Sequence, residues 1–173
     1  MPKIFNEEIL NAEFQLEGVH LVAASAGTGK TYNIQNIYVR LIVEKGLRVS
    51  EIQVMTFTDA ATKELRERLR SVLMDVQLCL EGRPCPGKDD KEAQKRAERA
   101  SLLVGVCGNK KTSKEMKAAI GLALLEFDNA AISTIHGFCS RALARYAFET
   151  RMPFIQQIEN NKEQELRRRT LDW

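Results

Sequence analysis

The chain has 173 residues and a net charge of +3, and 44% of its residues are hydrophobic while 28% are charged. This length suits one domain of ordinary size, and the composition is typical of a folded soluble protein rather than a disordered one. No apolar run approaches the roughly 18 residues that a membrane-spanning helix needs, so we expect no membrane partner and a cytoplasmic location. The four cysteines include no pair at the C-x2-C spacing of zinc or redox sites, which favours reduced thiols.

Strands and helices are predicted to alternate along the chain. In order, the patterns indicate a strand at 19–24, a helix at 30–45, a strand at 51–57, helices at 59–80, 91–104 and 113–127, a strand at 129–135 and a helix at 136–148. Gly46 is expected to end the first helix, and Asp59 to cap the second. This alternation predicts an α/β fold, in which a parallel sheet is flanked by helices. The helices between the second and third strands exceed a single crossover, so residues 81–127 are predicted to form a helical insertion.

The stretch LVAASAGTGKTYNI, residues 21–34, has the form of a phosphate-binding loop between a strand and a helix. Glycines let consecutive N–H groups turn around an anion, and the helix N-terminus behind them favours negative charge. A lysine suits the β- and γ-phosphates, and a threonine hydroxyl suits Mg²⁺. The motif therefore predicts a nucleoside triphosphate and Mg²⁺ as ligands. Lys30 and Thr31 are the predicted catalytic residues, and Thr31 is also the predicted magnesium ligand.

The predicted nucleotide-binding residues are Ala24, Ser25, Ala26, Gly27, Thr28, Gly29, Lys30 and Thr31. Ala24 stands where this motif usually has glycine. The loop tolerates that methyl group if the residue keeps a negative φ.

Three segments together resemble the N-terminal part of superfamily 1 DNA helicases of the UvrD type. AASAGTGKT resembles helicase motif I, VMTFTDAATKELRERL resembles motif Ia, and ISTIHGFCSRAL resembles motif Ib, in the family's order. Within the family, the chain is most similar to the RecB branch, the beta subunits of exodeoxyribonuclease V, and next most similar to the AddA branch. The resemblance runs from about residue 15 to residue 160. It implies a RecA-like P-loop NTPase domain that uses ATP and Mg²⁺ in DNA recombination and double-strand break repair.

The resemblance also implies partners. These are single-stranded DNA and the other subunits of a helicase–nuclease complex, RecC/RecD-like or AddB-like. The DNA-contacting residues that it implies are Thr56, Phe57, Thr58, Arg68, Thr134, His136 and Phe138. Threonine hydroxyls at a strand end suit phosphate oxygens, and an exposed phenylalanine can stack on a base. Gln15 is a weaker match to the family's adenine-reading glutamine, because its spacing to the loop differs.

For several of these residues, a purely structural role without DNA contact stays open. Phe57 could be a core aromatic, His136 could hydrogen-bond at a helix start, and Arg68 could lie on a solvated helix face. For Arg66 and Arg70 we favour the solvated face, where Glu64 and Glu67 would pair with them.

A complete motor of this family needs groups that the sequence does not contain. We find no acidic Walker B strand, and the family's transition-state arginine belongs to a second motor domain. The expected organisation is a partial motor domain 1A at 1–160 and a truncated start of the 1B insertion at 161–173. The parent protein is thus expected to be an ATP-dependent DNA helicase, of which this fragment alone does not unwind DNA. The alternatives are a complete small P-loop nucleoside or metabolite kinase and a non-catalytic nucleic-acid-binding module.

Overall fold

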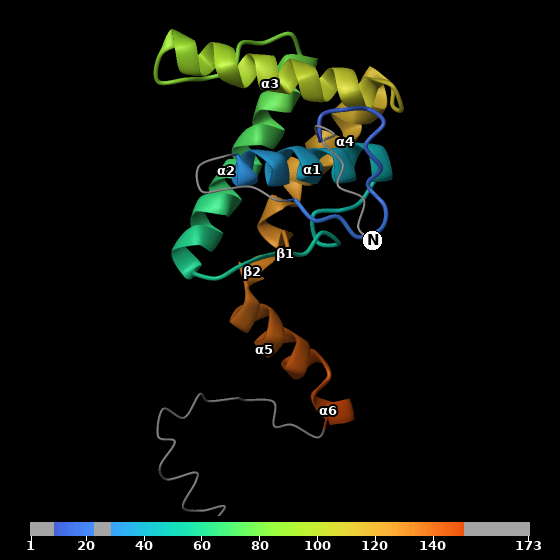
Figure 1. Ribbon diagram of the computed structural model, residues 1–173, viewed down its shortest axis with the longest axis vertical. Helices are drawn as coiled ribbons and strands as arrows, with labels where there is room; N and C mark the ends of the chain where they lie inside the picture. Colours follow the sequence, from blue (N-terminus) through green and yellow to red (C-terminus); the bar gives the residue numbers. More distant parts are fainter. Residues whose placement is uncertain (1–8, 23–28, 151–173) are drawn as a thin grey trace, which may run out of the picture. The chain divides into compact units, whose positions relative to one another are not determined.

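A computed structural model of the chain describes residues 9–22 and 29–150 (Figure 1). Its elements are α1 (Lys30–Lys45), β1 (Val54–Thr56), α2 (Asp59–Leu80), α3 (Asp90–Gly108), α4 (Ser113–Leu125), the 3-10 helix η1 (Phe127–Asn129), β2 (Ile132–Thr134), α5 (Ile135–Arg145) and α6 (Ala147–Thr150). The chain divides into two compact units, one up to Thr134 and one from Ile135 onward. Within the described ranges, no helix combines the length and apolar character that a membrane crossing needs.

The strands β1 and β2 form a two-stranded parallel sheet. Thr56 lies opposite Thr134 at the carboxyl end, and Val54 lies opposite Ile132 at the other end. The chain passes through α2, α3 and α4 between the two strands. The predicted mixture of helices with a parallel sheet is therefore confirmed, and both strands deliver their carboxyl ends to one edge. Two strands do not make a complete RecA-like sheet, so the RecA-like fold stays a prediction.

The predicted first strand, residues 19–24, is wrong over its described part. Residues 19–22 have no regular secondary structure, and the side chains of Val19 and Leu21 are 102% and 90% exposed. An apolar run becomes a buried strand only when neighbouring strands pair with it in a sheet. Neither β1 nor β2 pairs with residues 19–22. Residues 23 and 24 lie outside the described residues.

The predicted helices are largely confirmed, and their ends show what the sequence pattern missed. Gly46 caps α1 with a left-handed φ of 68°, as predicted. The cap of α2 is Thr58 instead of Asp59, because the Thr58 hydroxyl oxygen accepts the N–H of Ala61 at 3.1 Å. Both residue types suit a cap, so the sequence did not separate them. The third predicted helix extends four residues further, to Gly108.

Helices α1 to α4 enclose the hydrophobic core of the first unit. Figure 1 shows α2 running from β1 at its N-terminal end to α3 at its C-terminal end. The core residues of α2 recur every three or four positions and face all three other helices. The helical core side chains are Tyr38, Val39, Ile42, Val43, Leu65, Leu69, Val72, Leu73, Val76, Ala100, Leu103, Cys107, Met116, Ile120 and Ala123.

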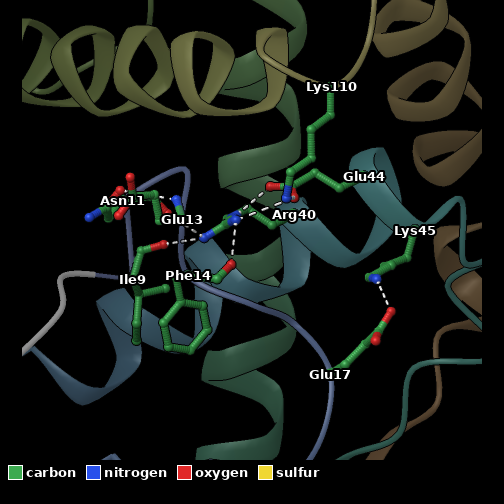
Figure 2. A network of polar contacts seen from close by, with 9 residues as sticks. All are labelled: Ile9, Asn11, Glu13, Phe14, Glu17, Arg40, Glu44, Lys45 and Lys110. Atoms are coloured by element: carbon green, nitrogen blue, oxygen red, sulfur yellow. Dashed lines mark hydrogen bonds and ion pairs between the residues drawn. The ribbon is translucent and has the colours of Figure 1, made fainter. Parts of the chain in front are cut away.

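A buried arginine joins the segment before α1 to the helix itself (Figure 2). Arg40 is fully buried, and its Nη1 donates to the carbonyl oxygens of Ile9 at 2.6 Å and Asn11 at 3.1 Å. Its Nη2 donates to the Phe14 carbonyl at 3.0 Å and to Glu44, and its Nε donates to the other oxygen of Glu44. All five N–H donors of the guanidinium group therefore have acceptors. Residues 9–14 are thereby held against α1.

Candidate nucleotide and nucleic-acid site

The N-terminus of α1 has no side-chain cap at its N-cap residue, Gly29. Gly29 precedes the helix with φ 89° and ψ 20°. Lys30 is exposed, Thr31 is half-buried, and the first turn contains no acidic residue. The N–H of Asn33 makes the first helical bond, to the Gly29 carbonyl at 3.0 Å, so the preceding N–H groups have no acceptor within the helix. These groups and the helix dipole favour an anion.

The other long helices of the first unit begin differently. Their N-caps are side chains: Thr58 for α2, Asp89 for α3 and Thr112 for α4. Each of those side chains accepts a backbone N–H of the first turn. Among these four helices, α1 alone has an N-cap residue that supplies no side-chain acceptor.

Position 29 requires glycine because of its backbone conformation, since a side chain there would not clash with its neighbours. A Cβ atom built there would meet only the Cβ of Tyr32, at the ordinary distance of 3.9 Å. The φ of 89°, in contrast, is a conformation that residues with side chains rarely adopt. The predicted cradle residues 24–28 lie outside the described residues. The roles of Lys30 and Thr31 stay predictions, although both residues open the helix as expected.

The residues at the start of α1 suit Mg²⁺ as a partner shared with phosphate. Mg²⁺ prefers oxygen ligands and is usually bound by one or two protein oxygens together with substrate phosphates. The Thr31 hydroxyl is such an oxygen. Among the described residues, no group of three or more histidine, cysteine or acidic side chains could hold a metal ion. A magnesium ion here would accordingly depend on the phosphate oxygens of a nucleotide.

The turn from β1 into α2 contains the residues predicted to contact DNA. The Thr56 hydroxyl donates to the Thr58 carbonyl at 3.1 Å and shares a 2.5 Å hydrogen bond with the Thr62 hydroxyl. The Thr58 hydroxyl is used to cap α2. Both predicted hydroxyl groups thus build the turn, while Phe57, Thr58 and Asp59 are the exposed residues there.

Phe57 is exposed at the carboxyl edge of the sheet. Its side chain is 86% exposed, which rules out the alternative of a core aromatic. It directly follows Thr56, and Thr56 lies opposite Thr134 of β2. The turn after β1 and the end of β2 therefore meet at one edge of the sheet, where open α/β sheets commonly bind ligands. An exposed aromatic ring suits stacking on a base.

Arg68 lies on the exposed face of α2. It forms an ion pair with Glu64, one turn earlier on the same helix. Both side chains are at least half exposed, so this pair contributes little to stability. The arrangement matches the alternative of a solvated helix face, and it leaves DNA contact by Arg68 as a prediction.

The predicted solvated face is wrong for Arg66 and confirmed for Arg70, which is exposed but pairs with a residue outside α2. Arg66 is half-buried and donates to the carbonyl oxygen of Ala130 at 3.1 Å, just before β2. Arg70 pairs with Asp128 at 3.6 Å and lies over the ring of Phe127, 5.7 Å from its centroid. These partners lie about 60 residues away along the chain, so helix spacing alone could not reveal them. Both arginines fasten α2 to the segment that leads into β2.

The second unit carries the remaining predicted residues on α5. No residue of α5 is buried, and His136 and Phe138 are both exposed. Their side chains are accessible to a ligand, but DNA contact by either of them stays a prediction. Gln15 is exposed as well, and its suggested part in reading adenine also stays a prediction.

Comparison with known proteins identifies relatives of the chain. A family described as the UvrD/REP helicase N-terminal domain matches residues 5–172. The chain is 38% identical over 155 residues to RecBCD enzyme subunit RecB of Escherichia coli (strain K12), a match that covers 83% of the chain and 12% of that relative. It is 38% identical over 150 residues to RecB of Haemophilus influenzae, with the same coverage. RecB of Mycobacterium tuberculosis is 31% identical over 123 residues, which cover 71% of the chain and 10% of that protein. The chain spans about 12% of the length of the first two relatives.

Proposed function

The chain belongs to the UvrD/REP helicase N-terminal domain family, and on this basis we propose that it is the ATP-binding N-terminal part of a RecB-like DNA helicase subunit. The observation that supports ATP binding most directly is the uncapped start of α1, with Gly29 in a left-handed conformation and Lys30 and Thr31 behind it. The whole protein would couple ATP hydrolysis to movement along single-stranded DNA during recombinational repair of double-strand breaks. Its partners would be the other subunits of a helicase–nuclease complex, and its location cytoplasmic.

The residues at the start of α1 have distinct tasks in this proposal. The backbone N–H groups of the first turn bind phosphate oxygens, and the Lys30 ammonium group balances the charge of the β- and γ-phosphates. The Thr31 hydroxyl oxygen is the protein ligand for Mg²⁺, which neutralises phosphate charge when bound. We propose that the isolated chain binds nucleotide without hydrolysing it, because its sequence contains no acidic Walker B strand. Residues 1–160 would belong to motor domain 1A, with the helical insertion at about 81–127, and 161–173 to the start of the 1B insertion.

The carboxyl edge of the sheet would contact single-stranded DNA. Phe57 is the described residue best suited to this, because its exposed ring can stack on a base of any sequence. Backbone N–H groups at the start of α2 could bind phosphate oxygens nearby. DNA contact would then lie beside a helix that follows a sheet strand, as ligand sites do in other α/β proteins.

Nucleotide binding through Lys30 can be tested directly. Titration of the chain with a fluorescent ATP analogue and Mg²⁺ should give binding that Lys30→Ala weakens by roughly 10- to 100-fold, the usual effect of losing a hydrogen bond to a charged group. Lys45→Ala is the matched control, since Lys45 lies at the other end of α1 and pairs with Glu17 at the surface. Binding unaffected by Lys30→Ala would contradict the proposal. Phosphate release by the isolated chain would favour the small-kinase alternative.

Contact of Phe57 with single-stranded DNA gives a second test. Phe57→Ala should weaken binding of an oligo-dT strand by about 1 to 3 kcal/mol, the usual contribution of one base stacked on an aromatic ring. Fluorescence anisotropy of a labelled strand measures this change. Leu125→Ala is the control, because Leu125 is an equally exposed apolar residue at the end of α4. Equal effects of the two substitutions would argue against stacking at Phe57.

A further inference from the structure

A buried carboxylate joins helices α2 and α3. Asp75 of α2 is fully buried, and the Arg96 guanidinium group of α3 donates three hydrogen bonds of 2.7 to 3.2 Å to its carboxylate oxygens. The same guanidinium group donates to the Ser71 hydroxyl at 2.8 Å. The hydrogen bond to Asp75 raises the pKa of Arg96 above its usual value. The charge of Asp75 is thus balanced by Arg96.

Arg99, one turn further along α3, brings a second positive charge to the same place. Its Nη2 is 3.7 Å from an Asp75 oxygen, too far for a hydrogen bond, and its side chain is only 15% exposed. Its Nε is buried without a hydrogen-bond partner, and burial lowers the pKa of this group. An arginine nevertheless stays protonated. Two guanidinium groups face one carboxylate, so the cluster carries one surplus positive charge.

The Arg99 side chain is directed at the first two turns of α1. Its Nη1 donates to the Gln35 side-chain oxygen at 2.7 Å, and its guanidinium carbon lies 5.5 Å from the centroid of the Tyr32 ring. Tyr32 directly follows Thr31, and Gln35 lies one turn beyond Thr31 on the same helix face. One helical turn is about 5.4 Å, so both contacts of Arg99 lie within about one turn of Thr31 along α1.

From this geometry, and resting on the proposed function, we propose that Arg99 is a specificity-determining residue of the nucleotide site, whose charge favours a nucleoside triphosphate over a diphosphate. The Arg99 charge is largely shielded from water, so salt screens it less than a surface charge. The Mg²⁺ complex of ATP carries one more negative charge than that of ADP, and the surplus cation therefore stabilises it more. Gln35 and Tyr32 keep the guanidinium group in place. Helix α3, and with it the helical insertion, thereby becomes part of the nucleotide site.

The test compares the affinities for ATP and ADP, each with Mg²⁺, in wild-type chain and variants. Arg99→Met should reduce the preference for ATP over ADP by about three- to tenfold, the size expected for one partly shielded unit charge on the order of 10 Å from the phosphates. Arg99→Lys keeps the charge and should retain most of the preference. Lys95→Met removes a charge from an exposed position of the same helix and should leave the preference unchanged.

A purely structural role of Arg99 is tested with a double variant. Arg99→Met leaves the buried Gln35 oxygen without a donor, whereas replacing both partners by apolar side chains is nearly neutral for folding. Gln35→Leu combined with Arg99→Met should therefore restore the melting temperature and still lack the ATP preference. Recovery of the preference in that variant, or equal losses for ATP and ADP in Arg99→Met, would overturn the inference.

Lys30→Ala, measured in parallel, separates this inference from the proposed function. Lys30-dependent binding by the wild-type chain with an unchanged preference in Arg99→Met would overturn the role of Arg99 alone. A wild-type chain that binds neither nucleotide would overturn both.

Discussion

Replacing Arg40 by alanine is expected to lower the free energy of unfolding by about 3 to 5 kcal/mol, the usual cost of removing one partner of a buried ion pair. Three carbonyl oxygens, of Ile9, Asn11 and Phe14, would lose their donor, and Glu44 would lose its nearest cation. Urea denaturation followed by circular dichroism measures the change. The result matters for function because Arg40 lies on α1, the helix that begins with Lys30.

The matched control for Arg40 is Arg48→Ala. Arg48 also makes two hydrogen bonds to one carboxylate, that of Glu126, but its side chain is 60% exposed. Its removal should change stability by less than about 1 kcal/mol. Arg40→Lys should fall near the alanine variant, since an ammonium group cannot reproduce a planar fork of five donors. A cost for Arg40→Ala no larger than that for Arg48→Ala would contradict the assignment.

The charges around Glu44 indicate why the Arg40→Ala variant would not leave this carboxylate unpaired. Burial raises the pKa of Glu44, but hydrogen bonds from Arg40 and Lys110 outweigh burial and hold the pKa below its usual value. Lys110 donates to Glu44 at 2.7 Å and is itself partly exposed (Figure 2). In the alanine variant, Lys110 would still neutralise Glu44. The remaining cost would then come mainly from the orphaned carbonyl groups and the cavity.

Local sequence signals were sufficient for the helices of the first unit. Helix α2 was predicted with the bounds that it has, because its apolar residues keep a helical period over 22 residues. The turn residues were informative too, since Gly46 adopts the left-handed conformation that ends a helix. The parallel pairing of β1 with β2 follows from the helices between them. All of these features depend on residues close together in sequence or on the order of the elements.

Buried polar side chains were the main features that the sequence did not reveal. Gln35, Asn36 and Arg40 of α1 are all buried, while the apolar Ile34 is exposed. Burial of a polar residue depends on partners that meet it only in the folded chain. The carbonyl acceptors of Arg40 lie 26 to 31 residues away from it.

In the candidate site, too, features set by the local sequence were predicted, and contacts between distant segments were missed. The motif predicted that Lys30 and Thr31 open a helix, because a phosphate-binding loop has a fixed local sequence. The placement of Arg99 beside Tyr32 and Gln35 was missed, since nothing in the local sequence connects α3 with α1. Motif Ia placed Thr56 and Thr58 at the end of a strand, as observed, but did not predict that their hydroxyls are used within the turn.

The Asp75 cluster leads to the second large effect. Asp75→Ala removes the carboxylate that Arg96 grips and that lies beside Arg99, so two guanidinium groups would face each other without a counterion. We expect a loss of about 3 to 5 kcal/mol in the free energy of unfolding. Asp128→Ala is the control, because Asp128 is almost fully exposed and pairs loosely with Arg70. A loss from Asp75→Ala no larger than that from the control would show that water already screens the cluster.

A second substitution at Asp75, to asparagine, should shift stability and nucleotide preference in opposite directions. Asp75→Asn keeps the shape of the side chain and removes its charge, so the surplus near α1 rises from one positive charge to two. The protein should become less stable, while its preference for ATP over ADP should increase by about threefold or more, since the added charge acts at a similar distance. Nucleotide titrations at a temperature where the variant is folded measure the preference. A role of this cluster in folding alone predicts an unchanged preference, so an unchanged value would separate the stability of the cluster from any effect on the nucleotide.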